Sequence, residues 1–340
     1  MLRSVKLNPK RGNASVCNAL IGQLVTAMMN PQSFRFLTVC LLCAGSTAHS
    51  QVIVNDTWLD GNRNDPASPT YSEYGADVDL DGDVESAWFR GGAGAFDPVG
   101  AGGPLRLTQG STSSSSLTTY FTPEGSELTL AAPGSSLSLT WRFTVSGTIV
   151  ANTGQGLRVA LVDSPAASRV TGNSSPASAA YTGYGMFINM NPALSHSRPL
   201  ELMERNVASG NLLSTGGDWV GRGFDGVSGN VGYQAGETYT LTMTLTRTAA
   251  GEIDILARMA GGTLNGTGLM SVSYLDATPH GGSFSFDTFQ FRPDGNDVAY
   301  DIIDTTLFRV ELTQVPEPAS SALVSVGLLG LIAAYRRARN

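Results

Sequence analysis

The sequence has 340 residues, of which 41% are hydrophobic and 14% charged, and this composition excludes a globally disordered chain. From Gln51 to Val315 there is no lysine, and 13 arginines face 27 acidic residues, a balance of −14. This charge excludes nucleic acid as a partner, because phosphate backbones would be repelled, and it favours divalent cations. All cysteines (Cys17, Cys40 and Cys43) precede Gln51, so the later region has neither disulfides nor thiol chemistry.

An export signal is predicted at residues 29–50. Arg35 supplies its positive charge, an apolar stretch too short to span a bilayer follows, and Ala48-His49-Ser50 offers the small residues that a signal peptidase reads. We expect the mature chain to begin at Gln51. Residues 1–28 have no strong pattern, and we interpret them as an over-extended start of the reading frame.

A calcium site is predicted in DVDLDGDVE, residues 77–85, within an acidic and loop-rich part that covers 51–104. Its carboxylates belong to Asp77, Asp79, Asp81, Asp83 and Glu85. Ca²⁺ takes six to eight oxygen ligands, which closely spaced carboxylates on a turning loop provide. The spacing resembles calcium loops of the EF-hand, dockerin and thrombospondin type, although Trp88 stands where an EF-hand has its bidentate Glu. The resemblance implies a structural calcium ion, and a solvated acidic loop is the alternative.

The region from Leu105 to Thr313 is a series of segments with period-2 alternation, separated by turn residues. In SLSLTWRFTV, for example, alternate residues from Leu137 to Val145 are apolar and share one face. No segment has the period of an amphipathic helix. The sequence therefore predicts an all-β domain at 51–313, with antiparallel sheets packed as a two-sheet sandwich or jelly roll.

The order of these strands resembles that of concanavalin A-like jelly rolls of the laminin-G and legume-lectin type. The closing third carries the resemblance: strands at 237–248 and 253–260 are joined by a short turn, and strands at 286–292 and 305–313 follow. The resemblance implies the fold but no single function, since this fold hosts lectins, hydrolases and inert modules.

One segment, GEIDILA at 251–257, partly matches the E-x-D-x-x-E motif of laminarinase-type glycoside hydrolases. Glu252 and Asp254 match the motif, but Ala257 stands where the acid/base should be. Retaining hydrolysis needs two carboxyl groups about 5 Å apart, so we interpret the segment as a hairpin strand. No nucleophile elbow, zinc-protease motif or phosphate loop is present, and the sequence predicts a protein that is not an enzyme.

The four tryptophans receive different predictions. Trp141 belongs to an inward-facing series, and Trp58 and Trp88 flank the acidic loop, where we expect them to pack beneath it. Trp219 lies between glycines in GGDWVGRG, so we expect it to be exposed near Arg222 and to bind a ligand with it, by stacking on a sugar ring.

The C-terminal residues 314–340 combine a Pro-Glu-Pro run, 17 uncharged residues at 319–335 and an arginine cluster. As a helix, the uncharged run would be about 25 Å long, just short of the ~30 Å hydrocarbon core, with cytoplasmic arginines after it. A plain membrane anchor is one interpretation. The residues that define a more specific pattern are Pro316, Glu317, Pro318, Arg336 and Arg337.

This order resembles the PEP-CTERM sorting signal of Gram-negative bacteria that make exopolysaccharide and carry an exosortase, a membrane protease thought to process such tails. The resemblance implies an exosortase-type partner, transient contact of 319–335 with the inner membrane, and a destination at the cell surface or in the extracellular matrix.

Together these features predict an exported, non-enzymatic β-sandwich module associated with extracellular polysaccharide. A polysaccharide hydrolase or lyase of the same fold, and a structural surface protein or adhesin, are the alternatives. A groove with two carboxylates about 5 to 9 Å apart would favour the hydrolase, and a groove without such a pair would favour binding.

Overall fold

A computed structural model describes residues 48–315, apart from 110–113, 148–152, 166, 208–209, 215, 283 and 295–298. The predicted start at 1–28, most of the predicted signal, the sorting residues from Pro316 onward and the hydrophobic helix expected at 319–335 lie outside these ranges. Within the described part, no helix is long and apolar enough to cross a membrane.

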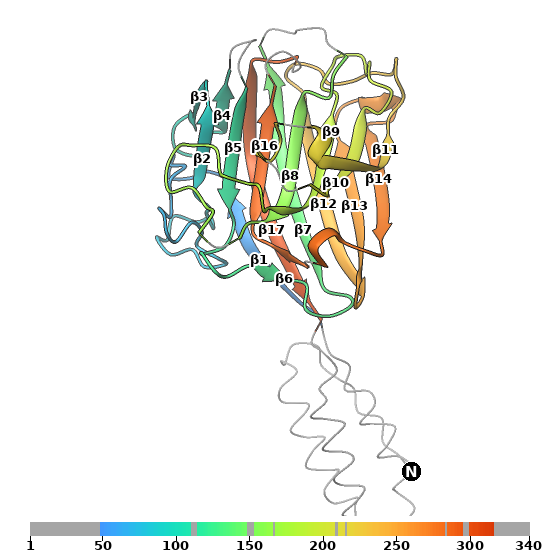
Figure 1. Ribbon diagram of the computed structural model, residues 1–340. Helices are drawn as coiled ribbons and strands as arrows, with labels where there is room; N and C mark the ends of the chain where they lie inside the picture. The colour runs from blue at the N-terminus through green and yellow to red at the C-terminus, as the bar shows by residue number, and fades with distance from the viewer. Residues whose placement is uncertain are drawn as a thin grey trace, which may run out of the picture. The chain divides into compact units, whose positions relative to one another are not determined.

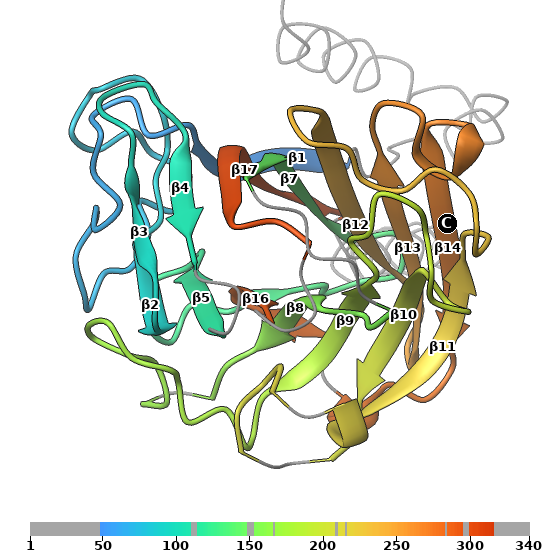
Figure 2. The same cartoon turned by 90° about the horizontal axis from the view of Figure 1, so that it is seen from above.

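The chain folds into two large antiparallel sheets that face each other (Figures 1 and 2). The eight-stranded sheet has the order β14-β13-β12-β7-β17-β4-β3. Strand β1 also pairs with β17, along the half that β4 does not cover. The strands of this sheet are β1 (His49–Asp56), β3 (Ala95–Pro98), β4 (Leu105–Thr108), β7 (Ser136–Ser146), β12 (Thr238–Ala249), β13 (Glu252–Ala260), β14 (Leu269–Asp276) and β17 (Ile302–Gln314).

The seven-stranded sheet has the order β11-β10-β9-β8-β16-β5-β2. Its strands are β2 (Trp88–Gly92), β5 (Ser115–Tyr120), β8 (Leu157–Asp163), β9 (Thr182–Ile188), β10 (Leu200–Arg205), β11 (Trp219–Asp225) and β16 (Thr288–Pro293). Strands β6 (Leu128–Thr129) and β15 (Ser285–Phe286) form a small additional ladder. The helices of the described residues are three short 3₁₀ turns, η2 (Gly216–Asp218), η3 (Leu264–Gly266) and η4 (His280–Gly282).

The core lies between the two sheets and follows from the alternation of each strand. In β7, every second side chain from Leu137 to Val145 is fully buried, and Trp141 stacks on Phe143 with ring centroids 4.2 Å apart. From the facing sheet, Phe291 approaches Trp141 to 4.8 Å between ring centroids. The prediction of an all-β, two-sheet antiparallel sandwich is therefore confirmed.

A second layer covers the outer face of the seven-stranded sheet. Phe289 and Phe291 of β16 point into the central core, so Gln290 and Arg292, which alternate with them, point outward. On this outer face a separate apolar cluster forms from strand and loop residues, which are Ala160, Val162, Tyr181, Phe187, Met203, Leu212, Leu213 and Trp219. The loop residues of this cluster, Tyr181, Leu212 and Leu213, therefore lie against the sheet.

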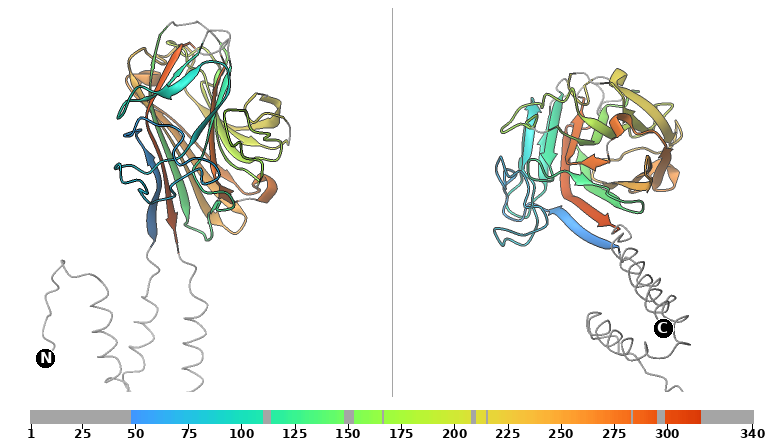
Figure 3. Two further views of the ribbon diagram at one scale, coloured as in Figure 1. Left: turned by 90° about the vertical axis from the view of Figure 1, so that its left-hand side faces the viewer. Right: turned by 60° about the horizontal axis from the view of Figure 1, so that its bottom comes forward.

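The segment between β1 and β2 lies at the edge of the sandwich beside β3 and β4 (Figures 1 and 3). Backbone hydrogen bonds hold it there, from Gly102 to the carbonyl of Trp58 (2.8 Å) and from Trp88 to the carbonyl of Arg63 (2.7 Å). An isolated bridge between Asn55 and Val84 returns the chain to the end of β1. This fold-back gathers the acidic residues of the segment.

Candidate functional site

Nine carboxylates gather in the segment that runs from the end of β1 to the start of β2. This acidic cluster consists of Asp56, Asp60, Asp65, Glu73, Asp77, Asp79, Asp81, Asp83 and Glu85. Its members form groups of three, in each of which one oxygen atom per residue lies within 4.8 Å of the others. The five residues predicted from the acidic loop all belong to these groups.

Sequence reasoning missed the other four members, because it looked only for ligand spacing within one loop. A broader signal was available: the stretch from Asp56 to Glu85 holds nine acidic residues and a single cation, Arg63. The fold brings the earlier acids onto the loop, as in the group of Asp56 with Asp83 and Glu85, whose three residues are all buried.

Several oxygens of the cluster are buried without a hydrogen-bond partner. Glu85 is only 1% exposed, and neither of its carboxylate oxygens has a partner. The same holds for Asp77 Oδ1, Asp81 Oδ2 and Asp83 Oδ1. None of the nine carboxylates forms an ion pair within the described ranges, and Arg63 directs its Nε to Asp97 outside the cluster (3.1 Å). Because an unpartnered buried carboxylate is strongly unfavourable, the cluster calls for a cation.

Other oxygens of the cluster accept hydrogen bonds, mostly from backbone N–H groups. Glu73 accepts hydrogen bonds from the backbone N–H groups of Val78 (2.6 Å) and Glu85 (2.9 Å). Asp83 Oδ2 accepts from the backbone N–H of Thr57 (2.7 Å) and from its hydroxyl (2.9 Å). The cluster is thus preorganised by its own loop.

The electrostatics of the metal-free cluster disfavour its charges. Burial, and after it the charges of Asp56 and Asp60, raise the pKa of Glu85 to about 10. Burial and then the charge of Asp83 raise the pKa of Asp56 well above its ordinary range. Burial, with the nearby Asp83 and Asp79, raises the pKa of Asp81 to about 6. A bound cation would reverse these effects, since an opposite charge favours ionised carboxylates.

The backbone around the cluster is unusual as well. Four non-glycine residues of this segment have positive φ, namely Trp58 (56°), Tyr71 (62°), Tyr74 (56°) and Leu80 (68°). Such backbone persists only where the surroundings determine it, which is typical of ligand clamps. Trp58 and Trp88, which flank the acidic loop, are fully buried in the central core with ring centroids 6.5 Å apart.

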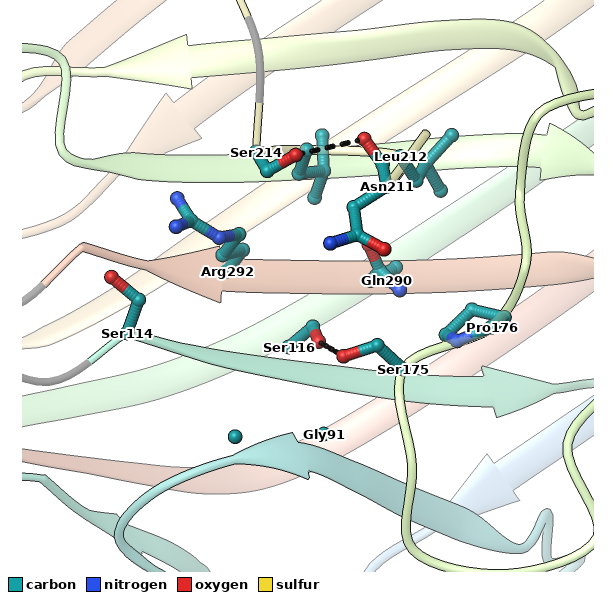
Figure 4. Close-up of a pocket in the computed structure, with 12 residues that line it drawn as sticks. Gly91, Ser114, Ser116, Ser175, Pro176, Asn211, Leu212, Ser214, Gln290 and Arg292 are labelled. Carbon is teal, nitrogen blue, oxygen red and sulfur yellow. Dashed lines mark hydrogen bonds between the residues drawn. The ribbon is translucent and has the colours of Figure 1, made fainter. Parts of the chain in front are cut away.

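A second candidate site is a polar pocket of about 140 Å³ on the outer face of the seven-stranded sheet (Figure 4). Its floor is formed by β2, β5 and β16, and its rim by residues 175–176 and 211–214. The polar side chains that line it are Ser114, Ser116, Ser175, Asn211, Ser214, Gln290 and Arg292. Among the described residues, no aspartate or glutamate belongs to the lining, but Asp294 lies directly beside it, where it accepts a hydrogen bond from the hydroxyl of Ser114 (3.3 Å) and pairs with Arg292 (3.4 Å).

Short-range contacts shape this pocket. The hydroxyls of Ser116 on β5 and Ser175 on the rim lie 2.8 Å apart, which ties the rim to the sheet (Figure 4). The rim passes so close to β2 that a Cβ at Gly91 would overlap Ser175 Oγ and lie 2.6 Å from its backbone nitrogen. Gln290 donates to Thr118 Oγ1 on the floor (2.7 Å). The pocket therefore presents hydroxyl, amide and guanidinium groups on a rigid sheet.

The predicted exposure of Trp219 is wrong. Its side chain is only 5% exposed, lies 5.8 Å from Phe187 between ring centroids, and donates its indole N–H to the carbonyl of Leu212 (2.9 Å). The preceding segment folds back over the ring, which sequence-local glycines could not reveal. Trp219 thus supports the pocket rim from beneath and cannot stack on a sugar. Arg222 lies elsewhere, where its Nε donates to Glu204 (2.8 Å).

The partial hydrolase motif lies on the opposite sheet from the pocket. Glu252 and Asp254 are on β13, and Glu252 accepts a hydrogen bond from the hydroxyl of Thr248 across the hairpin turn (2.5 Å). Ala257, at the position of the missing acid/base, is fully buried in the core. The interpretation of this segment as a hairpin strand is confirmed by the β12–β13 pairing.

Comparison with known proteins identifies the C-terminal tail. Residues 314–338 match the PEP-CTERM protein-sorting motif. The resemblance predicted for the tail is therefore confirmed. A comparison with curated protein sequences gives no match.

Similar chains among solved structures include lectin domains. The VIP36 exoplasmic/lumenal domain in its Ca²⁺/Man2-bound form is 13% identical with a TM-score of 0.41, covering 70% of this chain and 85% of that one. The carbohydrate recognition domain of Emp47p is 14% identical with a TM-score of 0.40, covering 76% and 96%. Lectin II from Ulex europaeus is 11% identical with a TM-score of 0.37, covering 79% and 99%. At these scores the likeness assigns no ligand to this chain.

Proposed function

We propose that the chain is an exported, non-enzymatic β-sandwich module of the cell surface or extracellular matrix, and that it binds extracellular polysaccharide. The match of residues 314–338 to the PEP-CTERM motif supports export and processing by an exosortase-type protease. It also supports a Gram-negative source and transient contact of residues 319–335 with the inner membrane.

The polar pocket on the seven-stranded sheet is the observation that carries the glycan proposal. Sugars offer many hydroxyl groups. The pocket presents the side-chain amides of Asn211 and Gln290 as donors and acceptors, and the guanidinium of Arg292, which pairs with Asp294 (3.4 Å), as a further donor. Concave sites in which a few convergent polar groups set orientation are typical of small-ligand recognition. The serines on the floor and rim add further hydroxyls at the same place.

The chemistry of the lining favours binding over hydrolysis. Glycoside hydrolysis needs two carboxyl groups flanking the scissile bond, 5 to 10 Å apart in round numbers. The described lining residues carry no carboxyl group, Asp294 beside them is paired with Arg292 (3.4 Å), and Glu252 and Asp254 are on the other sheet. The polysaccharide hydrolase or lyase is therefore the weaker alternative, and an adhesin with a protein partner would not need this pocket.

We also propose calcium as a structural cofactor, held by the acidic cluster that includes Asp77, Asp79, Asp81, Asp83 and Glu85. The unpartnered buried oxygens support a bound cation, and the all-oxygen ligand set suits a hard ion such as Ca²⁺. The ion would fix the segment between β1 and β2 against the edge of the sandwich.

A glycan array probed with the purified full chain tests the proposed function. We expect retention on a subset of bacterial polysaccharides, and a loss of roughly tenfold or more in affinity on Arg292→Ala or Asn211→Ala. Arg142→Ala is the matched control, because Arg142 is an exposed arginine on the other sheet. Absence of glycan binding by the wild-type chain, or equal losses in pocket and control variants, would refute the proposal.

A further inference from the structure

We infer that the acidic cluster is a two-ion calcium centre in which the carboxylate of Glu85 is shared by both ions. The inference rests on the proposed calcium cofactor and adds its stoichiometry and its central ligand. Its starting point is that Glu85 belongs to three different groups of the cluster. These groups are Asp56 with Asp83, Asp60 with Asp81, and Asp65 with Asp79, each completed by Glu85.

The spacing within each group fits shared coordination. Ca²⁺–oxygen distances are about 2.3–2.6 Å, so two oxygens on one ion are at most about 5 Å apart. In each group, the oxygens lie within 4.8 Å of one another, so each group can hold an ion. Asp56, Asp83 and Glu85 are all buried, whereas Asp60 and Asp79 are exposed. The first group therefore defines an inner site. The other two groups share Glu85 and each include an exposed aspartate, and we assign them to one outer site that water can reach.

Glu85 itself points to a ligand independently of the number of acids around it. Its side chain is 1% exposed, and both of its oxygens are buried without a hydrogen-bond partner. Glu73, by contrast, is buried nearby with both oxygens bonded to backbone N–H groups. The loop therefore has N–H groups to satisfy a buried glutamate, yet it leaves both oxygens of Glu85 without a hydrogen-bond partner.

Charge balance favours two ions over one. Seven carboxylates share the three groups around Glu85, and one Ca²⁺ offsets only two of these charges. A single ion takes six to eight oxygens, and backbone carbonyls and waters supply some of them. One ion therefore needs fewer than seven carboxylates. Asp83 Oδ2 is tied to Thr57, while its unpartnered Oδ1 remains available to the inner site. Unpartnered Asp81 Oδ2 is available on the outer side.

Native mass spectrometry and calorimetric titration of the full chain, stripped with EDTA and returned to CaCl₂, test the inference. We expect two Ca²⁺ per wild-type chain. Asp79→Asn changes an exposed outer ligand and should leave one tightly bound ion, whereas Glu85→Gln should weaken both sites by roughly tenfold or more. Asp254→Asn, an acid on β13 outside the cluster, should keep two ions.

The outcomes separate the inference from the cofactor proposal. One ion per wild-type chain would overturn the shared centre and leave a calcium cofactor standing. No bound calcium would overturn both. Two ions that both persist at wild-type affinity in Glu85→Gln would overturn the role of Glu85. Thermal melts of each variant in excess CaCl₂ show whether a lost ion reflects a lost fold. Because Asp79 is exposed, Asp79→Asn should remain folded, so its calcium stoichiometry tests the inference even if Glu85→Gln fails to fold.

Discussion

Replacing Glu85 by glutamine should have opposite effects in the presence and absence of calcium. In the metal-free protein, burial and then neighbouring acids raise the pKa of Glu85 from its ordinary value of 4.5 to about 10. Because the folded-state pKa of Glu85 lies above the unfolded one, the contribution of its protonated form to the free energy of unfolding is full below pH 4.5 and is lost as the pH rises toward 10. The calcium-free wild type should therefore become steadily less stable from pH 5 to pH 8.

The magnitude at pH 7 follows from this linkage. While the folded-state pKa stays above 7, the free-energy cost depends only on the 2.5-unit gap between pH 7 and the ordinary pKa of 4.5, at 1.36 kcal/mol per unit. Keeping Glu85 protonated in the fold thus costs about 3 kcal/mol, which glutamine avoids. For a domain of this size we expect Glu85→Gln to raise the Tm in EDTA by roughly 6–12 °C.

Differential scanning calorimetry in EDTA and in CaCl₂, at pH 5 and pH 8, measures the effect. In CaCl₂ the variant should lose stabilisation relative to wild type, because an amide binds Ca²⁺ less well than a carboxylate. Glu73→Gln is the matched control: both oxygens of Glu73 accept backbone hydrogen bonds, so this change should lower the Tm in EDTA. A Glu85→Gln variant no more stable than wild type in EDTA at pH 7 would refute the reasoning.

Three further predictions concern the ion and the pocket. Removing calcium with EDTA should lower the wild-type Tm. The expected loss in the free energy of unfolding is about 2.7 kcal/mol per ion when free calcium was at a hundredfold excess over Kd, and equal melting temperatures with and without EDTA would contradict a stabilising ion. Trp219→Phe should lose the hydrogen bond to Leu212 that supports the pocket rim, which lowers the free energy of unfolding by about 1 kcal/mol and weakens glycan retention. Its control, Trp141→Phe, should lose a core hydrogen bond to Thr305 Oγ1 (3.0 Å) without changing retention. Gly91→Ala should push the rim at Ser175 outward and reduce glycan retention. Gly251→Ala, whose added Cβ meets no atom within 4 Å, should leave it unchanged, and equal glycan retention by these two variants would count against the pocket.

The central strands could be predicted because their side chains report burial directly. Alternation in β7 and β12 requires one apolar face, and the structure buries Leu137, Trp141, Leu241 and Met243 completely. The order of strands within each sheet could not be predicted from this signal. Period 2 says which face is buried, but not which strand is the hydrogen-bonded neighbour. The pairing of β17 with β7, β4 and β1 joins segments more than 150 residues apart.

The acidic loop could be found in the sequence because its carboxylates are neighbours in the chain. Asp56, Asp60 and Asp65 could not be assigned to it, since the chain must first fold back along β1 to bring them near Glu85. The failure at Trp219 has the same origin. Flanking glycines indicate a flexible backbone, but the segment that buries the ring also shapes the pocket, and it reaches the sheet only in the folded protein.

The sequence by itself thus determined the class of fold, the tail that matches a sorting motif and the presence of a dense acidic loop, because each depends on residues close together in the chain. Only the tertiary structure decided which carboxylates lie within 4.8 Å of one another, that Glu85 is buried among them, and that β2, β5 and β16 carry a polar pocket. The physical reason is that burial and convergence depend on the surfaces that distant strands present to each other, and local patterns do not specify those neighbours.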